Sequence, residues 1–285
     1  MNKNFFHNRT AVLITNHKKE KVIFPVLRKA SMNLKLLDNI NTDSFGTFTR
    51  DVDRTGSQLE AARYKAFKAI ETTREPLAIA SEGSFGSHPT IFFAPANSEL
   101  VLLVDTLNNI EIQGWEISTD TNHSQEEVSS FSQAIKFANR CKFPAHGIVV
   151  SPNSAGDKSQ LIFKGVKTLS KLKQAVMECI ERSDDKNAFL ESDMRAMYNP
   201  TRMKVIKKAT ITLLNKMNSK CPDCGWPGFE VTEWIKGLIC EQCSLPTKGM
   251  LKHIYQCKKC LFQKVHQYPH GLQYSEPLYC DFCNP

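Results

Sequence analysis

Four Cys-x-x-Cys pairs lie toward the C-terminal end of this 285-residue chain, and they constrain its folding more than any other feature. A Cys-x-x-Cys turn places two sulfurs on one side of a tight loop, and two such turns complete a tetrahedral S4 shell around zinc. The spacing therefore predicts two structural zinc ions. Their expected ligands are Cys221, Cys224, Cys240, Cys243, Cys257, Cys260, Cys280 and Cys283.

The sequence leaves open how these pairs share the two ions. The simplest arrangement is sequential, with the first two pairs on one ion and the last two pairs on the other. An interleaved arrangement, in which each ion takes alternate pairs, is also compatible with the sequence. A disulfide framework is rare in a cytosolic chain. Iron–sulfur ligation is less expected, because the pairs are far apart and regular.

The cysteine-rich segment has little apolar sequence with which to build a core. Turn-forming residues are frequent in it, namely Gly225, Pro227, Gly228, Pro246, Pro269, Gly271, Pro277 and Pro285. Small folds of this kind draw their folding free energy from the metal. We therefore expect residues 220–285 to be a tandem zinc-ribbon module, in which short segments such as 229–234 form hairpins.

The charge of this module argues against a nucleic-acid partner. Residues 221–285 contain six lysines, no arginine and six acidic residues, so their side chains sum to zero. Each Zn(Cys)4 centre adds a charge of about −2, because four thiolates outweigh one Zn²⁺. A net acidic module lacks the electrostatic footprint of nucleic-acid binding. The ribbons are therefore expected to be structural or to contact a protein partner.

The chain as a whole has ordinary globular composition, with 41% hydrophobic and 23% charged residues. Its longest apolar runs are far below the roughly 20 residues that a membrane span needs. The first residues contain no long apolar core and no small-residue cleavage site, so no secretory signal is expected. Unpaired cysteines without such a signal favour a cytoplasmic protein that does not associate with membranes.

Residues 1–219 alternate between expected strands and helices. Short strands are expected over residues 11–15 and 77–80, and a strand–turn–strand hairpin over residues 99–117. Helices are expected over residues 18–29, 57–70, 125–141, 169–182 and 201–218. This alternation predicts an α/β domain, with a mixed sheet and flanking helices, in front of the ribbon module.

Positive charge is concentrated at both ends of this domain. Residues 1–40 sum to +6 and residues 157–220 to +7, whereas the residues between them are net acidic. If the two basic segments meet, they form a basic site for a small anionic ligand. The alternative is that their lysines line solvated helix faces. Nucleic acid, the less favoured partner, would bind these segments weakly and in a salt-dependent way.

Candidate ligand-binding residues lie in polar blocks between the apolar segments. Asn16, Lys18 and Lys19 follow the first strand, where the start of a helix presents backbone N–H groups to an anion. A solvated loop is the alternative there. Asp43 lies in a loop rich in hydroxyl groups, which can bind phosphate or a metal.

Two glutamates also occupy positions typical of a site. Glu60 lies three residues after Ser57, and the capping box that this pair forms is a complete structural explanation for it. Glu82 follows the strand expected over residues 77–80, in a block with Ser84 and His88. Ligands bind at such strand ends in open α/β sheets. His88 could equally be an ordinary loop residue.

A further block places Asp193, Arg195 and Arg202 around the start of the last expected helix. The helix dipole does not favour arginines at that end. Either an anionic ligand or Asp193 must therefore compensate them. A salt-bridged helix cap is the alternative to an anion site.

Several of these blocks resemble an uncharacterised bacterial family known only as a domain of unknown function. The similar segments are Asp-x-Phe-Gly-Thr-Phe-Thr from Asp43, Ser-Glu-Gly-Ser-Phe-Gly from Ser81, the block around Arg195, and the cysteine ribbon. The resemblance covers nearly the whole chain but implies no known activity. The chain departs from it at Thr49-Arg50, where the family has Thr-Gly-Glu, so one acidic ligand is missing.

The N-terminal part is also similar to inosine-triphosphate pyrophosphatases and their Maf relatives. The similar segments are Ile14-Thr-Asn-His-Lys-Lys19, Glu60-Ala-Ala-Arg-Tyr-Lys-Ala66, and Ser81-Glu-Gly-Ser84 in the position of those enzymes' acidic loop. Their order and spacing agree over about the first 120 residues, although each motif differs in detail. The resemblance implies Mg²⁺-dependent hydrolysis of a nucleotide or related phosphate compound.

Two functional hypotheses follow. As a hydrolase, the chain would hold Mg²⁺ with Glu60 and Glu82, and with Asp43 as a further carboxylate, because Mg²⁺ takes one or two carboxylates plus phosphate oxygens. Its phosphate-binding residues would be Lys18, Lys19, Lys65, Arg195 and Arg202. The alternative is a non-enzymatic scaffold, whose α/β domain senses a small anion and whose ribbons contact another protein. A shared Mg²⁺ requires the carboxylates of Glu60 and Glu82 to lie within about 6 Å of each other.

Overall fold

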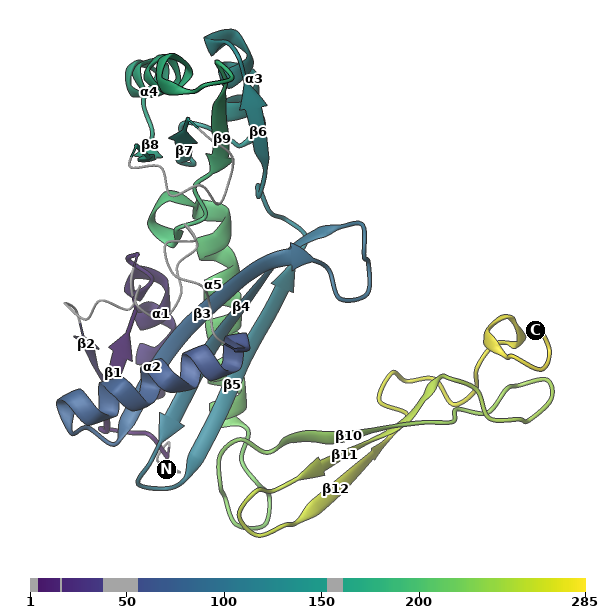
Figure 1. The fold of residues 1–285 in the computed structure, drawn as a ribbon. Coiled ribbons are helices and arrows are strands. Elements are labelled where there is room, and N and C mark those ends of the chain that lie inside the picture. The colour runs from purple at the N-terminus through teal and green to yellow at the C-terminus, as the bar shows by residue number, and fades with distance from the viewer. Residues whose placement is uncertain (1–4, 16, 38–55, 153–160) are drawn as a thin grey trace. The chain divides into compact units, whose positions relative to one another are not determined.

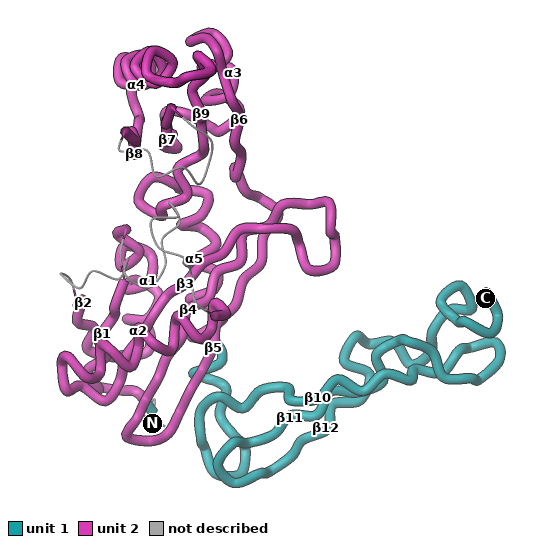
Figure 2. The backbone as a smooth tube through the Cα atoms, viewed as in Figure 1, with its two compact units in different colours: residues 1–5, 215–285 teal, residues 6–214 magenta. Residues whose placement is uncertain are grey.

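The computed structural model describes residues 5–15, 17–37, 56–152 and 161–285 (Figure 1). The chain divides into two compact units (Figure 2). Phe6–Leu214 form the α/β unit, and Met1–Phe5 with Asn215–Pro285 form the ribbon unit. Asn16 and Asp43, two of the predicted site residues, lie outside the described residues.

The larger sheet of the α/β unit has five strands in the order β2-β1-β3-β4-β5. The strands are β1 (Thr10–Ile14), β2 (Asn33–Leu37), β3 (Leu77–Ser87), β4 (Pro95–Asp105) and β5 (Ile110–Ser118). β1 runs parallel to β2 and β3, whereas β3, β4 and β5 form an antiparallel meander. The sheet is therefore mixed, as the sequence predicts.

Strand β3 is much longer than the sequence led us to expect. Every residue from Leu77 to Ser87 pairs with a residue of β4. Glu82 and Ser84, which we expected in a loop after the strand, therefore lie within it. β1 ends opposite Ala80, so the second half of β3 extends past the end of its parallel neighbour.

Helix α2 (Gln58–Thr73) packs on one face of this sheet and begins at the predicted capping box. Its buried alanines let the helix approach the strands closely. The core on this face consists of Val12, Ile14, Ala62, Ala66, Ala69, Ala78, Ala80, Leu100, Leu102 and Val104. The strand residues in this core alternate along β1, β3 and β4, so the intervening residues of each strand point to the opposite face.

Helix α5 (Pro200–Asn218) packs on the opposite face. A Cβ atom on Gly114 of β5 would lie 2.2 Å from the carbonyl oxygen of Ala209, so glycine is required where the helix crosses the strand. The shorter α1 (Glu20–Leu27) connects β1 to β2 and continues as a 3-10 turn over Arg28–Ala30. Among the described helices, none is long and apolar enough to cross a membrane.

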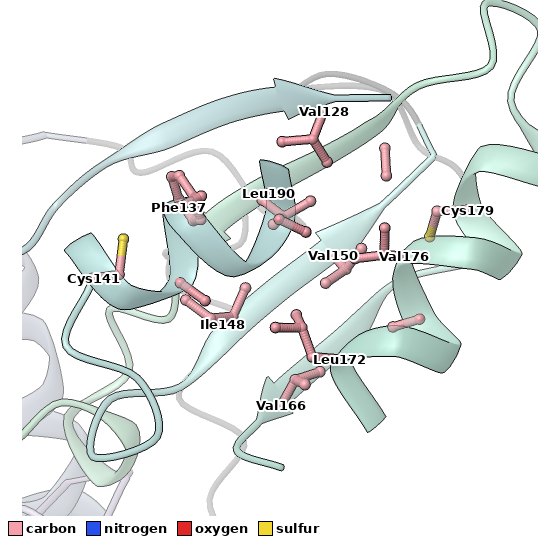
Figure 3. Close-up of a cluster of buried hydrophobic side chains, with 14 residues drawn as sticks. Val128, Phe137, Cys141, Ile148, Val150, Val166, Leu172, Val176, Cys179 and Leu190 are labelled. Atoms are coloured by element: carbon pink, nitrogen blue, oxygen red, sulfur yellow. The ribbon is translucent and has the colours of Figure 1, made fainter. Parts of the chain in front are cut away.

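A second, antiparallel sheet has the strand order β6-β9-β7-β8. Its strands are β6 (Gln125–Val128), β7 (Ile148–Ser151), β8 (Phe163–Val166) and β9 (Ala188–Ser192). Helices α3 (Phe131–Arg140) and α4 (Leu169–Arg182) pack their apolar sides against it (Figure 3). The side chains of Cys141 and Cys179 are buried in this core.

The helix expected over residues 125–141 was placed too early. Its first four residues form β6, because Gln125–Val128 pair with β9. Ser130 then caps α3 by accepting a hydrogen bond from the backbone N–H of Gln133. A 3-10 turn over Ala196–Tyr198 connects β9 to α5.

The ribbon unit is built on a three-stranded antiparallel sheet. β11 (Met250–Gln256) lies between β10 (Glu230–Lys236) and β12 (Gln263–Gln267). The chain reverses direction with each strand, so the four cysteine turns alternate between the two ends of the sheet (Figure 1). A 3-10 turn over Pro277–Tyr279 precedes the last cysteine pair. The prediction of a mixed α/β fold with a C-terminal ribbon module is confirmed.

Candidate metal centres and a buried charge cluster

Two groups of four cysteines in the ribbon unit could each hold a metal ion. The first group is Cys221, Cys224, Cys257 and Cys260. Its Sγ–Sγ distance is 3.7 Å between Cys221 and Cys260, and 3.6 Å between Cys224 and Cys257. A tetrahedral ion with bonds of about 2.3 Å to sulfur requires an edge of about 3.8 Å. A disulfide would require about 2.05 Å, so the spacing fits one shared ion.

The second group is Cys240, Cys243, Cys280 and Cys283. Its Sγ–Sγ distance is 3.9 Å between Cys240 and Cys283, and 3.6 Å between Cys243 and Cys280. Each of the eight predicted ligands therefore belongs to one of the two groups. The sequential pairing that we considered simplest is wrong. The pairing is interleaved, because the antiparallel strands bring alternate cysteine turns to the same end of the sheet.

The pKa values of two of these cysteines are shifted by their surroundings in ways that bear on cation binding. Backbone N–H groups of Cys283 and Phe282 lower the pKa of Cys280 to about 7, which favours the thiolate that binds metals. Contact with the Cys243 sulfur instead raises the pKa of Cys283 to about 12. Four sulfurs at this spacing repel one another as thiolates, and a divalent ion at their centre removes that repulsion.

A different kind of site lies in the α/β unit, where Lys19 is buried at the start of α1. Only 5% of Lys19 is exposed, and its Nζ donates to the carbonyl oxygen (3.2 Å) and to the Oγ (3.3 Å) of Ser81. Among the described residues, no carboxylate lies within ion-pair distance of this ammonium. Burial, and then the charge of Arg202, lowers the pKa of Lys19 to about 8.

The loop that leads to Lys19 has an unusual backbone. His17 and Lys18 are consecutive non-glycine residues in the left-handed region, with φ of 65° and 60°. Such conformations cost about 1–3 kcal/mol each and cluster at functional sites. Burial, and then the charge of Lys19, lowers the pKa of His17 to about 3, so its imidazole is neutral at pH 7. The side chain of Lys18 is exposed.

Glu82 lies on the α2 side of the sheet. Its carboxylate forms an ion pair with Lys65, and both side chains are largely buried. The neighbouring Gln58 donates to the carbonyl oxygens of Glu82 (2.9 Å) and Ser98 (3.1 Å), which ties the start of α2 to β3 and β4. Ser81 is the adjacent residue on the strand, so its side chain points to the opposite face, toward Lys19.

Glu60 acts as the capping residue that its spacing indicates. It is exposed, and its Oε2 accepts a hydrogen bond of 2.6 Å from the backbone N–H of Ser57. That hydrogen bond lowers the pKa of Glu60. The structure thus gives Glu60 and Glu82 separate partners, the backbone N–H of Ser57 and the ammonium of Lys65. Among the described residues, the two cysteine groups are the clusters of three or more potential metal ligands.

Arg202 and Glu99 form a fully buried ion pair, with 2.6 Å between Nε and Oε1. Nη1 of Arg202 also donates to the carbonyl oxygen of Met194 (2.6 Å), and its guanidinium lies 5.3 Å from the ring centre of Phe85. A Cβ atom on Gly83 would lie 2.5 Å from both Nη2 of Arg202 and Oε2 of Glu99. Glycine at this position of β3 therefore makes room for the pair.

The block around Arg195 forms the salt-bridged cap that was our alternative. Nη2 and Nε of Arg195 lie 2.7 Å and 3.0 Å from the carboxylate of Asp193. The guanidinium stacks over Tyr198 at 4.6 Å from the ring centre. Asn199 caps α5 by accepting a hydrogen bond of 2.9 Å from the backbone N–H of Arg202. Both arginines that we expected to bind phosphate are thus engaged by carboxylates.

Ser84 and His88 lie along the distal half of β3 and the turn after it. Ser84 is half-buried and pairs with Ser98 of β4. Nδ1 of His88 accepts hydrogen bonds from the backbone N–H groups of Thr90 and Ile91, each at 3.2 Å. His88 therefore stabilises the β3–β4 turn, as an ordinary loop residue does.

The buried charge cluster consists of Lys19, Glu82, Arg195, Arg202 and their partners. Sequence reasoning missed His17, Ser81 and Glu99 as members of this cluster. Glu99 carried a usable signal, because it is a lone carboxylate at the start of the apolar run that forms most of β4. His17 and Ser81 lie inside blocks that we singled out. Their contribution depends on the direction of each side chain, which the sequence leaves open.

Fold and sites define a mixed α/β protein that carries a C-terminal ribbon module with two four-cysteine groups that could each hold a metal ion. Residues 65–285 match the family described as Domain of unknown function (DUF6671), and the chain belongs to that family. The expectation of an uncharacterised family is thereby confirmed. No curated protein matches the chain.

Proposed function

We propose that the α/β unit binds a phosphate-bearing anionic ligand at Lys19, and that two zinc ions hold the ribbon unit together. The buried ammonium of Lys19 carries the first part of the proposal. A buried charge is stable only when it is paired or neutralised. The contacts of Lys19 with Ser81 supply hydrogen bonds but no negative charge. An anionic ligand would supply it.

The surrounding charges favour this assignment. Three carboxylates of the cluster are each paired with their own cation: Glu82 with Lys65, Glu99 with Arg202, and Asp193 with Arg195. Among the described residues of the cluster, Lys19 is the cation in excess. It also precedes the first turn of α1, whose dipole favours an anion. The similarity to inosine-triphosphate pyrophosphatases, which begins at this segment, supports a nucleotide or related phosphate compound as the ligand.

Replacing Lys19 by methionine is expected to stabilise the unliganded protein and to abolish phosphate binding. Folding lowers the pKa of Lys19 from 10.5 to about 8, so the folded protein holds fewer protons than the unfolded chain between these pH values. Its stability therefore rises with pH through that range. At pH 7 the Lys19→Met variant should gain about 1–3 kcal/mol. Urea denaturation at pH 7 and pH 10 measures this gain, which should shrink at the higher pH.

Ligand binding is measured on the same proteins by thermal denaturation. Millimolar pyrophosphate or nucleoside triphosphate should raise the melting temperature of the wild type, because a ligand that binds only the folded state stabilises it. The Lys19→Met variant should show no such shift. Lys18→Met is the matched control, since Lys18 is adjacent but exposed. A shift that Lys18→Met removes and Lys19→Met retains would refute the assignment.

Hydrolysis is a second candidate function, and the position of Glu82 favours it. Glu82 is a buried carboxylate directly after Ser81, the residue that Lys19 contacts. Mg²⁺ would bind Glu82 and take its remaining ligands from phosphate and water, and it would have to displace Lys65. Glu60 would stay in its capping box.

A screen of nucleoside triphosphates with Mg²⁺, assayed for pyrophosphate and phosphate release, tests this candidate. We expect Mg²⁺-dependent release that Glu82→Gln sharply reduces, because the metal would lose a charged oxygen while the side chain keeps its volume. If the wild type binds a nucleotide but releases no product, the site belongs to the anion-sensing scaffold of our alternative hypothesis.

Zinc is the proposed metal because an all-sulfur tetrahedral shell is typical of structural zinc sites. Iron–sulfur clusters fit less well, since such a cluster distributes its four cysteines over two or four irons and would hold cysteines on different irons farther apart. Eight reduced thiolates require a reducing compartment, which supports a cytoplasmic location.

A further inference from the structure

Large apolar side chains gather at the end of the ribbon unit that carries the second cysteine group. Leu272, Tyr274, Leu278, Tyr279 and Phe282 are each 53–68% exposed. Ile239 and Leu245, on the neighbouring cysteine turn, are 40% and 41% exposed. We name these seven residues the distal apolar patch. Exposed clusters of this kind mark interaction sites in soluble proteins.

The backbone beneath the patch is held in a fixed shape. The N–H of Ser275 donates to the carbonyl oxygen of Ile239 (2.8 Å), and the N–H of Glu241 donates to that of Ser275 (3.1 Å). Nδ2 of Asn284 donates to the carbonyl oxygen of Leu278 (3.1 Å). Because these bonds and the cysteine group hold the backbone, little backbone freedom is lost when a partner covers the patch.

The same end of the unit is acidic. Residues 237–249 and 268–285 contain Glu241, Glu276 and Asp281, with Lys248 as their single lysine or arginine. Lys248 pairs with Asp281 at 2.8 Å. Glu241 and Glu276 are exposed, and neither has a basic partner among the described residues. Four thiolates around a divalent ion add about −2. This field repels nucleic acid and anionic membranes, and it attracts a cationic surface.

We propose that the distal apolar patch is a docking surface for a lysine- or arginine-rich amphipathic segment of a partner protein. Tyr279 and Phe282 would be the aromatic anchors, since buried aromatic side chains dominate interface energetics. Glu241 and Glu276 would pair with basic residues at the rim and set the orientation of the segment. This surface is separate from the ligand site at Lys19 and does not depend on it.

The test titrates the full-length, metal-loaded protein with an amphipathic peptide of leucine and lysine, followed by calorimetry at physiological salt. A leucine–glutamate peptide of the same length and pattern is the comparison. We expect the lysine peptide to bind and the glutamate peptide not to bind. The double substitution Tyr279→Ser/Phe282→Ser should weaken binding at least about tenfold. Glu276→Lys should weaken it through charge alone.

Trp234→Ser is the matched control, because Trp234 is an aromatic residue of β10 that is 59% exposed and lies outside the patch. It should leave the affinity unchanged, and the metal content of every variant should equal that of the wild type. Unchanged binding by Tyr279→Ser/Phe282→Ser at full metal content would overturn the proposal, as would equal binding of the glutamate peptide.

Two further outcomes would assign the patch to a different occupant and overturn the proposed partner. Displacement of the lysine peptide by a single-stranded RNA oligonucleotide would identify a nucleic-acid surface. Concentration-dependent self-association, seen by sedimentation and lost in Tyr279→Ser/Phe282→Ser, would identify a second copy of the chain as the occupant. Neither result bears on phosphate binding at Lys19, so the two proposals fail independently.

Discussion

The Arg202→Met variant is expected to lose about 3–5 kcal/mol of the free energy of unfolding of the α/β unit, because it leaves Glu99 charged and buried without its cation. Both side chains of the pair are fully buried. The substitution also removes the donor to the carbonyl oxygen of Met194. Domains are stable by about 5–15 kcal/mol, so the loss is a large fraction of the total. Urea denaturation followed by circular dichroism measures it.

A double variant separates the cost of the unpaired charge from the value of the pair. Arg202→Met/Glu99→Gln removes both charges and should recover most of the lost stability, since uncharged replacements of a buried ion pair are often nearly neutral. Arg63→Met is the control, because it breaks a partly exposed pair with Glu111 and should cost about 0–1 kcal/mol. A single variant no worse than this control would contradict our account of Arg202.

Removal of the metal is expected to unfold the ribbon unit and to leave the α/β unit with its own cooperative transition. The buried apolar cluster of the ribbon unit consists of Cys221, Phe229 and Cys257, with Trp226 and Tyr255 packed beside it. A cluster this small cannot replace the roughly 10–16 kcal/mol that structural zinc supplies. Limited proteolysis after chelation should therefore cut within residues 220–285 and spare the α/β unit.

Zinc added back should restore protection of the ribbon unit. The variant Cys179→Ala provides the control, because Cys179 is buried in the α/β unit and is not a ligand. Its metal content and its response to chelation should match those of the wild type. A ribbon unit that resists protease after complete loss of metal would contradict the prediction.

The metal ligands could be predicted from the sequence, whereas their pairing could not. A Cys-x-x-Cys turn is a local motif, so its spacing reveals the ligands directly. The pairing depends on where the intervening strands lie and which way they run. Phe229–Trp234 was recognised as a candidate hairpin strand, but β11 and β12 were not. With all three strands placed as a meander, alternate turns fall at the same end of the sheet and the interleaved pairing follows.

The charge cluster was predictable only in part, because long-range pairing overrides local pattern in β3. The segment from Ser81 to His88 is rich in serine and glycine and indicates a loop. It is nevertheless mostly strand, because β4 pairs with it along its whole length. Gly83, which suggested a loop, instead leaves space for Arg202 and Glu99. The side chains of Ser81 and Glu82 consequently point to opposite faces of the sheet.

Partners also decide which predicted cations are open to a ligand. Arg202 and Lys65 are each neutralised by a carboxylate that is distant in the sequence, and Arg195 is neutralised by the nearby Asp193. Lys19 has no such carboxylate among the described residues. The sequence grouped these four residues with Lys18 as phosphate-binding candidates, and of the two that remain without such a partner in the described part of the chain, Lys19 is the buried one. Lys18, the exposed neighbour, serves as the control.

Metal stoichiometry in two double variants tests the interleaved centres most directly. In the structure, Cys224→Ser/Cys257→Ser removes two ligands from one centre and leaves the other intact, whereas Cys224→Ser/Cys243→Ser damages both centres. After challenge with a competing chelator, the first variant should retain about one ion per chain and the second none, because only a complete S4 shell holds the metal tightly. The reverse result, with one ion in the second variant and none in the first, would show sequential pairing and contradict the structure.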